Sequence, residues 1–213
     1  MRLIPNPPGT IEDGEIFING RDILKLSENE MTEVRGGEVS LILQDPMTAL
    51  NPVFNVSSQV GEAISIHQGL KGNSLWEKIV ESLRSVRIPA AEVRAKDFPH
   101  QLSGGMRQRV VGAIGISSAP TVLIADEPTT SLDVTIQAAY LRLLKRIQAE
   151  TDVGIIFITH DFGIVAKMCD RVAVMYAGRI VESADVRTIF NNPLHEYTKA
   201  LLSAVPGKKW KKE

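Results

Sequence analysis

The chain has 213 residues, of which 44% are hydrophobic and 23% are charged, and its formal net charge is −1. This length and composition are ordinary for one domain with a sizeable core, and the charge balance gives no indication of nucleic-acid binding. The single cysteine, Cys169, excludes an internal disulfide framework, and no apolar run approaches the roughly 20 residues that a membrane-spanning helix needs.

The first fifth of the chain predicts two strands. Residues 15–20 indicate a strand that runs into an Asn-Gly turn, and residues 39–43 form a short apolar run typical of a second strand. That second strand ends at Gln44, and two prolines make the segment from there to Pro52 a loop. An amide side chain at a strand end can ligate Mg²⁺ or position water, although Gln44 alone is equally an ordinary polar loop residue.

A helical region follows the loop. Leu75, Ile79, Leu83 and Val86 recur at spacings of three and four, which predicts an amphipathic helix whose apolar stripe packs in a core. Mostly helical patterns continue from residue 56 to residue 117, so we expect a helical subdomain there.

The segment Leu102-Ser-Gly-Gly-Met-Arg-Gln-Arg-Val110 closes this region. The two adjacent glycines leave backbone N–H groups open to a phosphate, and residues 106–116 can continue as a helix. Ser103 would then lie at the helix N-terminus, where both cap chemistry and the helix dipole favour an anion. The alternative is a helix start with a glycine hinge and no ligand.

An apolar strand is predicted over Val122 to Ala125, and it delivers Asp126 and Glu127 to the carboxyl edge of a sheet. One carboxylate there can hold Mg²⁺ while its neighbour polarises an attacking water. Without further context, the same two acids could merely cap a strand.

The last third of the chain alternates strands and helices. We predict a helix over 134–150 after Ser131-Leu-Asp133, a buried strand over 154–158 that leads to His160, a helix over 162–168, and strands over 171–176 and 179–182. This alternation predicts an α/β fold with a mainly parallel sheet. His160 could sense a γ-phosphate through its imidazole, although most histidines at strand ends are structural or incidental.

The segment 102–110 and the run Thr121-Val-Leu-Ile-Ala-Asp-Glu-Pro-Thr129 together resemble the signature and Walker B motifs of ABC-type ATPases, in the order and at the spacing of that family. The resemblance implies a P-loop NTPase (RecA-like) core with a helical subdomain. It divides the chain into residues 1–55 (core with the Q-loop), 56–117 (helical subdomain), 118–183 (remaining core) and 184–213 (a C-terminal extension that looks cut short).

The resemblance also implies ATP and Mg²⁺ as ligands and assigns roles to single residues. Asp126 and Gln44 correspond to Mg²⁺ partners, Glu127 to the general base, and His160 to the switch histidine. The remaining expected contacts act across a subunit dimer on a nucleotide that the partner holds: Ser103, Gly104, Gly105, Gln108 and Asp133.

The stretch Asp45-Pro-Met-Thr-Ala-Leu-Asn-Pro52 is similar to the oligopeptide, dipeptide and nickel importer branch of the family. This implies a subunit that is peripheral at the cytoplasmic face of the cell membrane. Its expected partners are a second ATPase subunit, membrane permease subunits and, indirectly, a solute-binding protein, with no nucleic acid.

The 213 residues contain no Gly-x-x-x-x-Gly-Lys-Ser/Thr phosphate loop. The nearest spacing, Gly9 to Gly14, is followed by Glu15 in the lysine position, and an acid there would repel a phosphate. By resemblance the phosphate loop lies upstream of residue 2, so we expect a chain truncated at its start that binds Mg·ATP weakly or not at all on its own.

Two other functions compete with this interpretation. A non-catalytic regulatory or pseudo-ATPase subunit could use the same surfaces without hydrolysing ATP. A soluble ABC ATPase acting on DNA is disfavoured because the sequence has neither a zinc or coiled-coil insertion nor a basic face. The basic cluster Lys208–Lys212 is expected to be a solvated tail, with contact to anionic lipid as the alternative.

Overall fold

The computed structural model describes residues 1–44, 49–130 and 132–205. The described chain falls into two units, Met1–Ile156 and Phe157–Glu213, which we describe separately. The loop segment Asp45 to Thr48, Ser131 and the basic tail Lys208–Lys212, on all of which the sequence raised expectations, lie outside the described residues. Within the described ranges, no helix is both long and apolar enough to cross a membrane.

The first unit begins with a small hairpin of β1 (Phe17–Ile18) and β2 (Arg21–Asp22), which pair antiparallel. Its turn is Asn19-Gly20, and both residues have positive φ, 49° and 77°. The predicted Asn-Gly turn is therefore confirmed, because this turn type needs left-handed backbone that Asn and Gly adopt readily. The strands themselves are shorter than the sequence suggested.

Helix α1 (Glu28–Gly37), which our sequence analysis missed, follows the hairpin. Ser27 caps it: the serine side chain accepts from the Glu30 amide, and the Glu30 side chain accepts from the Ser27 amide at 2.7 Å. This capping box satisfies two otherwise unpaired donors, and the spacing Ser27-x-x-Glu30 was the signal that could have revealed the helix.

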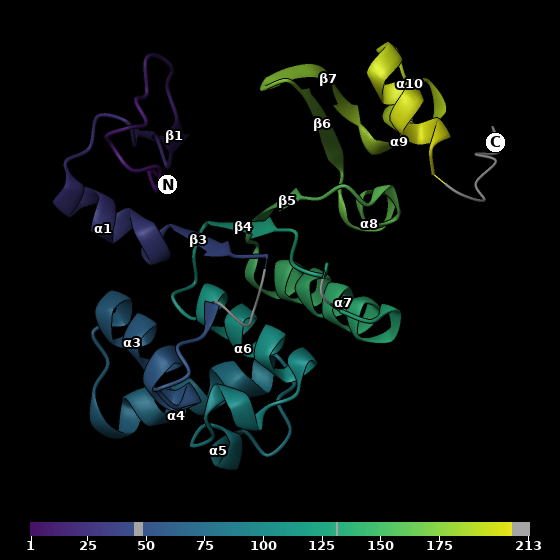
Figure 1. Ribbon diagram of the computed structural model, residues 1–213. Helices are drawn as coiled ribbons and strands as arrows, with labels where there is room; N and C mark the ends of the chain where they lie inside the picture. The colour runs from purple at the N-terminus through teal and green to yellow at the C-terminus, as the bar shows by residue number, and fades with distance from the viewer. Residues whose placement is uncertain (45–48, 131, 206–213) are drawn as a thin grey trace. The chain divides into compact units, whose positions relative to one another are not determined.

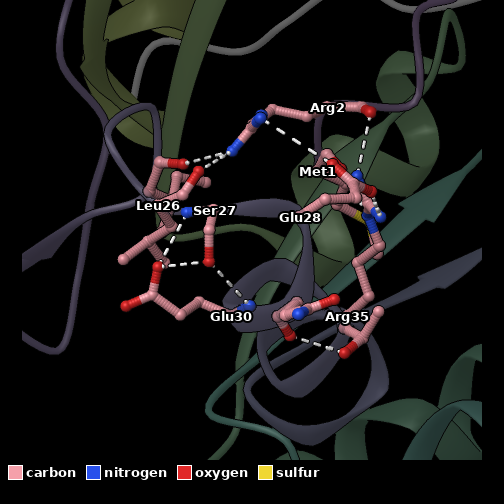
Figure 2. A network of polar contacts seen from close by, with 10 residues as sticks. Met1, Arg2, Leu26, Ser27, Glu28, Glu30 and Arg35 are labelled. Atoms are coloured by element: carbon pink, nitrogen blue, oxygen red, sulfur yellow. Dashed lines mark hydrogen bonds and ion pairs between the residues drawn. The ribbon is translucent and has the colours of Figure 1, made fainter.

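Polar contacts tie the first residues to α1, as Figure 2 shows. The guanidinium of Arg35 donates to the carbonyl oxygens of Met1 (2.9 Å) and Arg2 (3.1 Å), while Arg2 in turn donates to the Leu26 carbonyl. Arg35 also pairs with Glu28. The N-terminal segment is thus held by side chains rather than by pairing in the sheet.

A sheet has the strand order β3–β4–β5, with β3 at Val39–Ile42, β4 at Val122–Asp126 and β5 at Gly154–Ile158, and the bound of the first unit falls within β5, after Ile156. Strands β3 and β4 are parallel, and Ile42 lies opposite Ala125. Because parallel strands end at the same edge, the residues that follow β3 and β4 emerge side by side, as the sequence predicted.

The expectation that β5 is buried is wrong for one of its faces. The side chains of Ile156 and Ile158 are 53% and 49% exposed. They lie on the same face because strand side chains alternate. An apolar run predicts a strand, but it does not determine whether another element covers each face.

In the first unit, α3, α4 and α6 each pack against the other two (Figure 1). Helix α6 also contacts β3 and α7. In the α4 stripe, Ile79, Leu83 and Val86 are buried, as the periodicity predicted. The helices after β3 have these bounds: α3 Val56–Gln68, α4 Gly72–Ser85, α5 Ala91–Arg94, the 3₁₀ turn η1 Pro99–Gln101, α6 Gly104–Ile116 and α7 Val134–Thr151.

The second unit contains an antiparallel pair of strands with short helices beside it (Figure 1). The bounds are α8 Phe162–Met168, β6 Arg171–Tyr176, β7 Arg179–Asp185, α9 Val186–Asn191 and α10 Glu196–Ser203. The sequence correctly predicted α8 and β6. Strands β6 and β7 run antiparallel, so the parallel pairing that the sequence predicted is seen between β3 and β4 but not in this pair.

The core of the second unit forms around Ile189, Phe190 and Leu202, and Phe162 meets Phe190 edge to face at 5.8 Å. The carboxylate of Glu182 on β7 joins the segment before α10 to the strand by accepting from the Leu194 amide at 2.8 Å and the His195 amide at 3.1 Å. Partial desolvation raises the pKa of Glu182, but these hydrogen bonds stabilise the carboxylate and the net pKa is lowered.

Candidate functional site

Helix α6 begins at the glycine pair that the sequence singled out. Ser103 is the N-cap, with extended backbone, and its Oγ accepts from the Met106 amide at 3.3 Å. Ser103 and Gly104 are exposed, and a Cβ added at Gly104 would meet no atom of the described residues within 4 Å. The first-turn amides of a helix have no partner inside the helix, so an anion can approach them in this open space.

The two other glycines of interest on α6 face α7 rather than solvent. A Cβ at Gly105 would lie 2.9 Å from Ile136 Cγ2, and one at Gly112 would lie 3.2 Å from the Tyr140 hydroxyl oxygen. The glycines therefore permit close approach of the two helices. The seven-residue spacing of Gly105 and Gly112, two turns apart on one helix face, is the signal for this packing that our sequence analysis overlooked.

Gln108 lies inside the first unit, between α6 and the turn after β4. Its side chain is fully buried, and its Nε2 donates to the Pro128 carbonyl oxygen at 2.7 Å. The buried Tyr140 hydroxyl lies beside it: burial raises the pKa of Tyr140, and the Gln108 side chain partly offsets this. In this structure Gln108 therefore holds the turn after β4 in place, and its expected contact with a nucleotide stays a prediction.

The acidic turn follows directly from β4. Asp126 ends the strand and Glu127 comes next, both half-buried, and Glu127 has the left-handed φ of 45°. The Thr130 hydroxyl donates to the Glu127 carboxylate, and the Thr130 amide donates to the Glu127 carbonyl oxygen at 3.3 Å. A non-glycine residue in this conformation is uncommon and needs surrounding contacts to hold it, which Thr130 supplies.

Asp133 caps α7, because its Oδ1 accepts from the amides of Thr135 and Ile136, both at 3.0 Å. The first turns of α7 are also tied to the acidic turn, since the side-chain Nε2 of Gln137 donates to the Thr129 hydroxyl oxygen at 3.2 Å. Asp133 is exposed, so one side of its carboxylate remains open to solvent.

Gln44 lies two residues beyond the end of β3 and is exposed. The register that sets Ile42 opposite Ala125 brings Gln44, Asp126 and Glu127 to the same edge of the sheet. Carboxylate and amide oxygens are suitable ligands for Mg²⁺, which commonly uses one or two protein carboxylates together with phosphates and water. In the part of the chain that the structure describes, no three His, Cys, Asp or Glu side chains converge into a metal-binding cluster.

His160 belongs to the second unit and lies in the connection between β5 and α8, where it is exposed. Its neighbour Asp161, which the sequence analysis did not single out, caps α8 by accepting from the Gly163 amide at 2.6 Å and the Ile164 amide at 3.3 Å. The local backbone around the histidine is therefore fixed by this cap.

Comparison with known proteins gives two family matches, one to residues 5–130 and one to residues 181–213. Residues 5–130 match the family model described as ABC transporter, and residues 181–213 match the one described as oligopeptide/dipeptide transporter, C-terminal region.

Curated relatives match nearly the whole chain. The oligopeptide transport ATP-binding protein OppD of Bacillus subtilis (strain 168) is 52% identical over 206 residues, which cover 97% of this chain and 58% of OppD. The dipeptide transport ATP-binding protein DppD of the same organism is 49% identical over 206 residues, with 97% and 62% covered. The chain therefore spans about three fifths of the length of these relatives.

Solved structures with a similar fold are ATP-binding cassettes. One is the dimeric, post-hydrolysis state of the cassette MJ0796 bound to ADP and Pi, with a TM-score of 0.72, 25% identity, and 83% of this chain and 75% of that chain covered. Another is cbiO1 from Clostridium perfringens, part of the ABC transporter complex cbiONQ, with a TM-score of 0.74, 27% identity, and 92% and 74% covered.

Proposed function

This chain belongs to the ABC transporter family of ATP-binding proteins, and from that premise we propose that it is the ATP-hydrolysing subunit of an importer for peptides or related solutes. The observation that carries the choice of branch is the match of residues 181–213 to the C-terminal region of oligopeptide and dipeptide transporters, together with about 50% identity to OppD and DppD. The fold is that of the P-loop NTPase cassettes, as the sequence predicted.

We propose the following assembly. Two such ATPase subunits form a dimer and bind membrane permease subunits at the cytoplasmic face. A solute-binding protein is an indirect partner of this assembly. Within the chain, residues 56–117 form the helical subdomain, residues 1–55 and 118–183 belong to the ATPase core, and residues 184–213 form a C-terminal extension. Support comes from similar proteins: the MJ0796 structure is described as dimeric, and cbiO1 is described as part of a transporter complex.

The residues fit a nucleotide and its metal at two places. The exposed N-terminus of α6, with Ser103 and Gly104 in open space, fits a phosphate of a nucleotide held by a partner subunit. The oxygens of Asp126 and Gln44, at one sheet edge, fit Mg²⁺. A bound Mg²⁺ would neutralise part of the negative charge of the phosphates.

The remaining proposed roles rest on the resemblance to the family, and the chemistry of each side chain suits them. Glu127 would accept a proton from the attacking water, and the Thr130 hydroxyl orients its carboxylate. His160 would donate a hydrogen bond to the terminal phosphate and so respond to its loss. Asp133 would lie on the surface that meets the partner's nucleotide, whereas the buried Gly105 would act by letting α6 approach α7, and Gln108 by its bond to Pro128.

The function is tested by peptide uptake. In cells that lack the gene for this protein, accumulation of labelled dipeptides and oligopeptides should fall at least tenfold and should recover when the gene is restored. Uptake of a labelled free amino acid serves as the control and should not change. Unaltered peptide uptake in the deletion strain would exclude the peptide branch.

The alternative is a non-catalytic subunit that presents Ser103 to a complete partner. These 213 residues contain no phosphate-loop motif, so a nucleotide titration tests how they bind ATP.

Calorimetric titration of the 213-residue polypeptide with Mg·ATP should show binding no tighter than the millimolar range, because the lysine and backbone cradle of that motif are missing from it. Mixing with a complete relative should then restore one composite site. Micromolar binding by the 213 residues alone would mean that other residues grip the phosphates.

A further inference from the structure

Four arginines line a hollow on the first unit that lies outside the residues discussed above. The hollow has a volume of about 160 Å³ and is bordered by the end of α4, by α6 and by α7. Among the residues that the structure describes, its lining includes no acidic residue, and its basic residues are these: Arg87, Arg109, Arg142 and Arg146. Such a concentration of charge is unexpected in a chain whose net charge is −1.

Two of these arginines are anchored by the backbone at the end of α4. Arg109 Nη1 donates to the Arg87 carbonyl oxygen at 3.1 Å, and Arg146 Nη2 donates to the Ser85 carbonyl oxygen at 2.6 Å. The last carbonyls of a helix attract cations, so capping of α4 explains why these two guanidinium groups are here. Each guanidinium has five N–H donors, so most of the donors of both groups remain.

Capping does not explain the other two guanidinium groups. In residues 1–44, 49–130 and 132–205, neither Arg87 nor Arg142 has a side-chain hydrogen bond or ion pair, and both are exposed. In the same ranges, Nε of Arg146 is buried without a hydrogen-bond partner, and its nearest acid is Glu150 at 3.7 Å. A buried donor without a partner is costly, and a bound acceptor would remove that cost.

Charge balance then selects the kind of ligand. The four arginines and Glu150 leave a net positive charge of three. One phosphate group carries at most about two negative charges near neutral pH, so it does not balance the cluster. Arginine forks match phosphate oxygens in a bidentate manner. We infer that this hollow, which we call the arginine hollow, binds a small ligand with two phosphate groups and is a site separate from the nucleotide-binding surfaces proposed above.

The test uses the purified full-length protein and inorganic diphosphate as the probe. Titration is done at low ionic strength with saturating Mg·ADP, so that nucleotide sites are filled and any remaining binding reports another site. We expect one diphosphate per chain, bound more tightly than inorganic phosphate and weakened by added salt. Because one charge-assisted contact is lost, Arg142→Gln should weaken diphosphate binding by about tenfold or more.

Two controls test whether a loss of diphosphate binding is specific to the arginine hollow. Arg142 is exposed and without a partner in the described ranges, so Arg142→Gln should retain the native circular dichroism spectrum, and Arg187→Gln on α9 should bind diphosphate as the unaltered protein does. Absence of diphosphate binding, or equal binding by Arg142→Gln, would overturn the inference. Binding of a hexaglutamate peptide but not of diphosphate would also overturn it, in favour of an acidic protein segment.

Discussion

Replacing Glu127 by glutamine is expected to lower ATP turnover by the full-length protein at least about 100-fold, while ATP binding stays within about threefold of its original affinity. The loss has the size typical for removal of a general base. Glutamine keeps the shape of the side chain and still accepts from the Thr130 hydroxyl, so the turn that follows β4 should stay folded. Steady-state phosphate release and nucleotide titration measure the two effects separately.

The matched control is Glu62→Gln, because Glu62 is an exposed residue on α3 outside the acidic turn. Its turnover should equal that of the unaltered protein. If Glu127→Gln hydrolyses ATP at the normal rate, Glu127 is not the base. If it loses both binding and turnover together with its native circular dichroism, the effect is on folding, and the test must be repeated with Glu127→Asp.

The second large effect concerns the packing of α6 on α7. Gly105→Val should lower the free energy of unfolding by about 1–3 kcal/mol, because even a Cβ would lie 2.9 Å from Ile136 Cγ2 and the valine methyl groups would add further overlap. Valine has a slightly better helix propensity than glycine, by a few tenths of a kcal/mol, so propensity offsets only a small part of the clash. Urea unfolding followed by circular dichroism gives the difference.

Two further variants test whether the clash with Ile136 causes the loss of stability. Gly104→Val, at a position with open space around it, should stay within about 0.5 kcal/mol of the unaltered protein. Adding Ile136→Ala to Gly105→Val should recover part of the lost stability if the clash is the cause. Equal stability of Gly105→Val and Gly104→Val would show that the two helices are not closely packed at this point.

Local signals in the sequence were sufficient for much of the fold and for where several site residues lie. The Ser103 cap, the strand that ends at Asp126 and the bounds of α8 and β6 follow from caps, apolar runs and turn residues, which act over a few positions. The roles of Asp126, Glu127 and His160 stay predictions, because they depend on a ligand and a partner.

Other features depend on residues far apart in the chain. The burial of Gln108 depends on Pro128, twenty residues later, and Gly105 meets Ile136 from another helix. The exposed face of β5 depends on what covers the strand, and no local pattern contains that information. The left-handed Glu127 is likewise held by Thr130 and not by its own preference. Long-range packing therefore determines the features that the local sequence patterns did not predict.

The buried bond between Gln108 and Pro128 has a consequence for communication between two subunits. In the proposed dimer, the start of α6 faces the partner's nucleotide, whereas the turn of Pro128 carries the acid that serves the chain's own nucleotide. One fully buried amide joins these two elements inside a single subunit. A displacement of α6 by one nucleotide would therefore move the acid at the other, and thermodynamic reciprocity requires the influence to act in both directions.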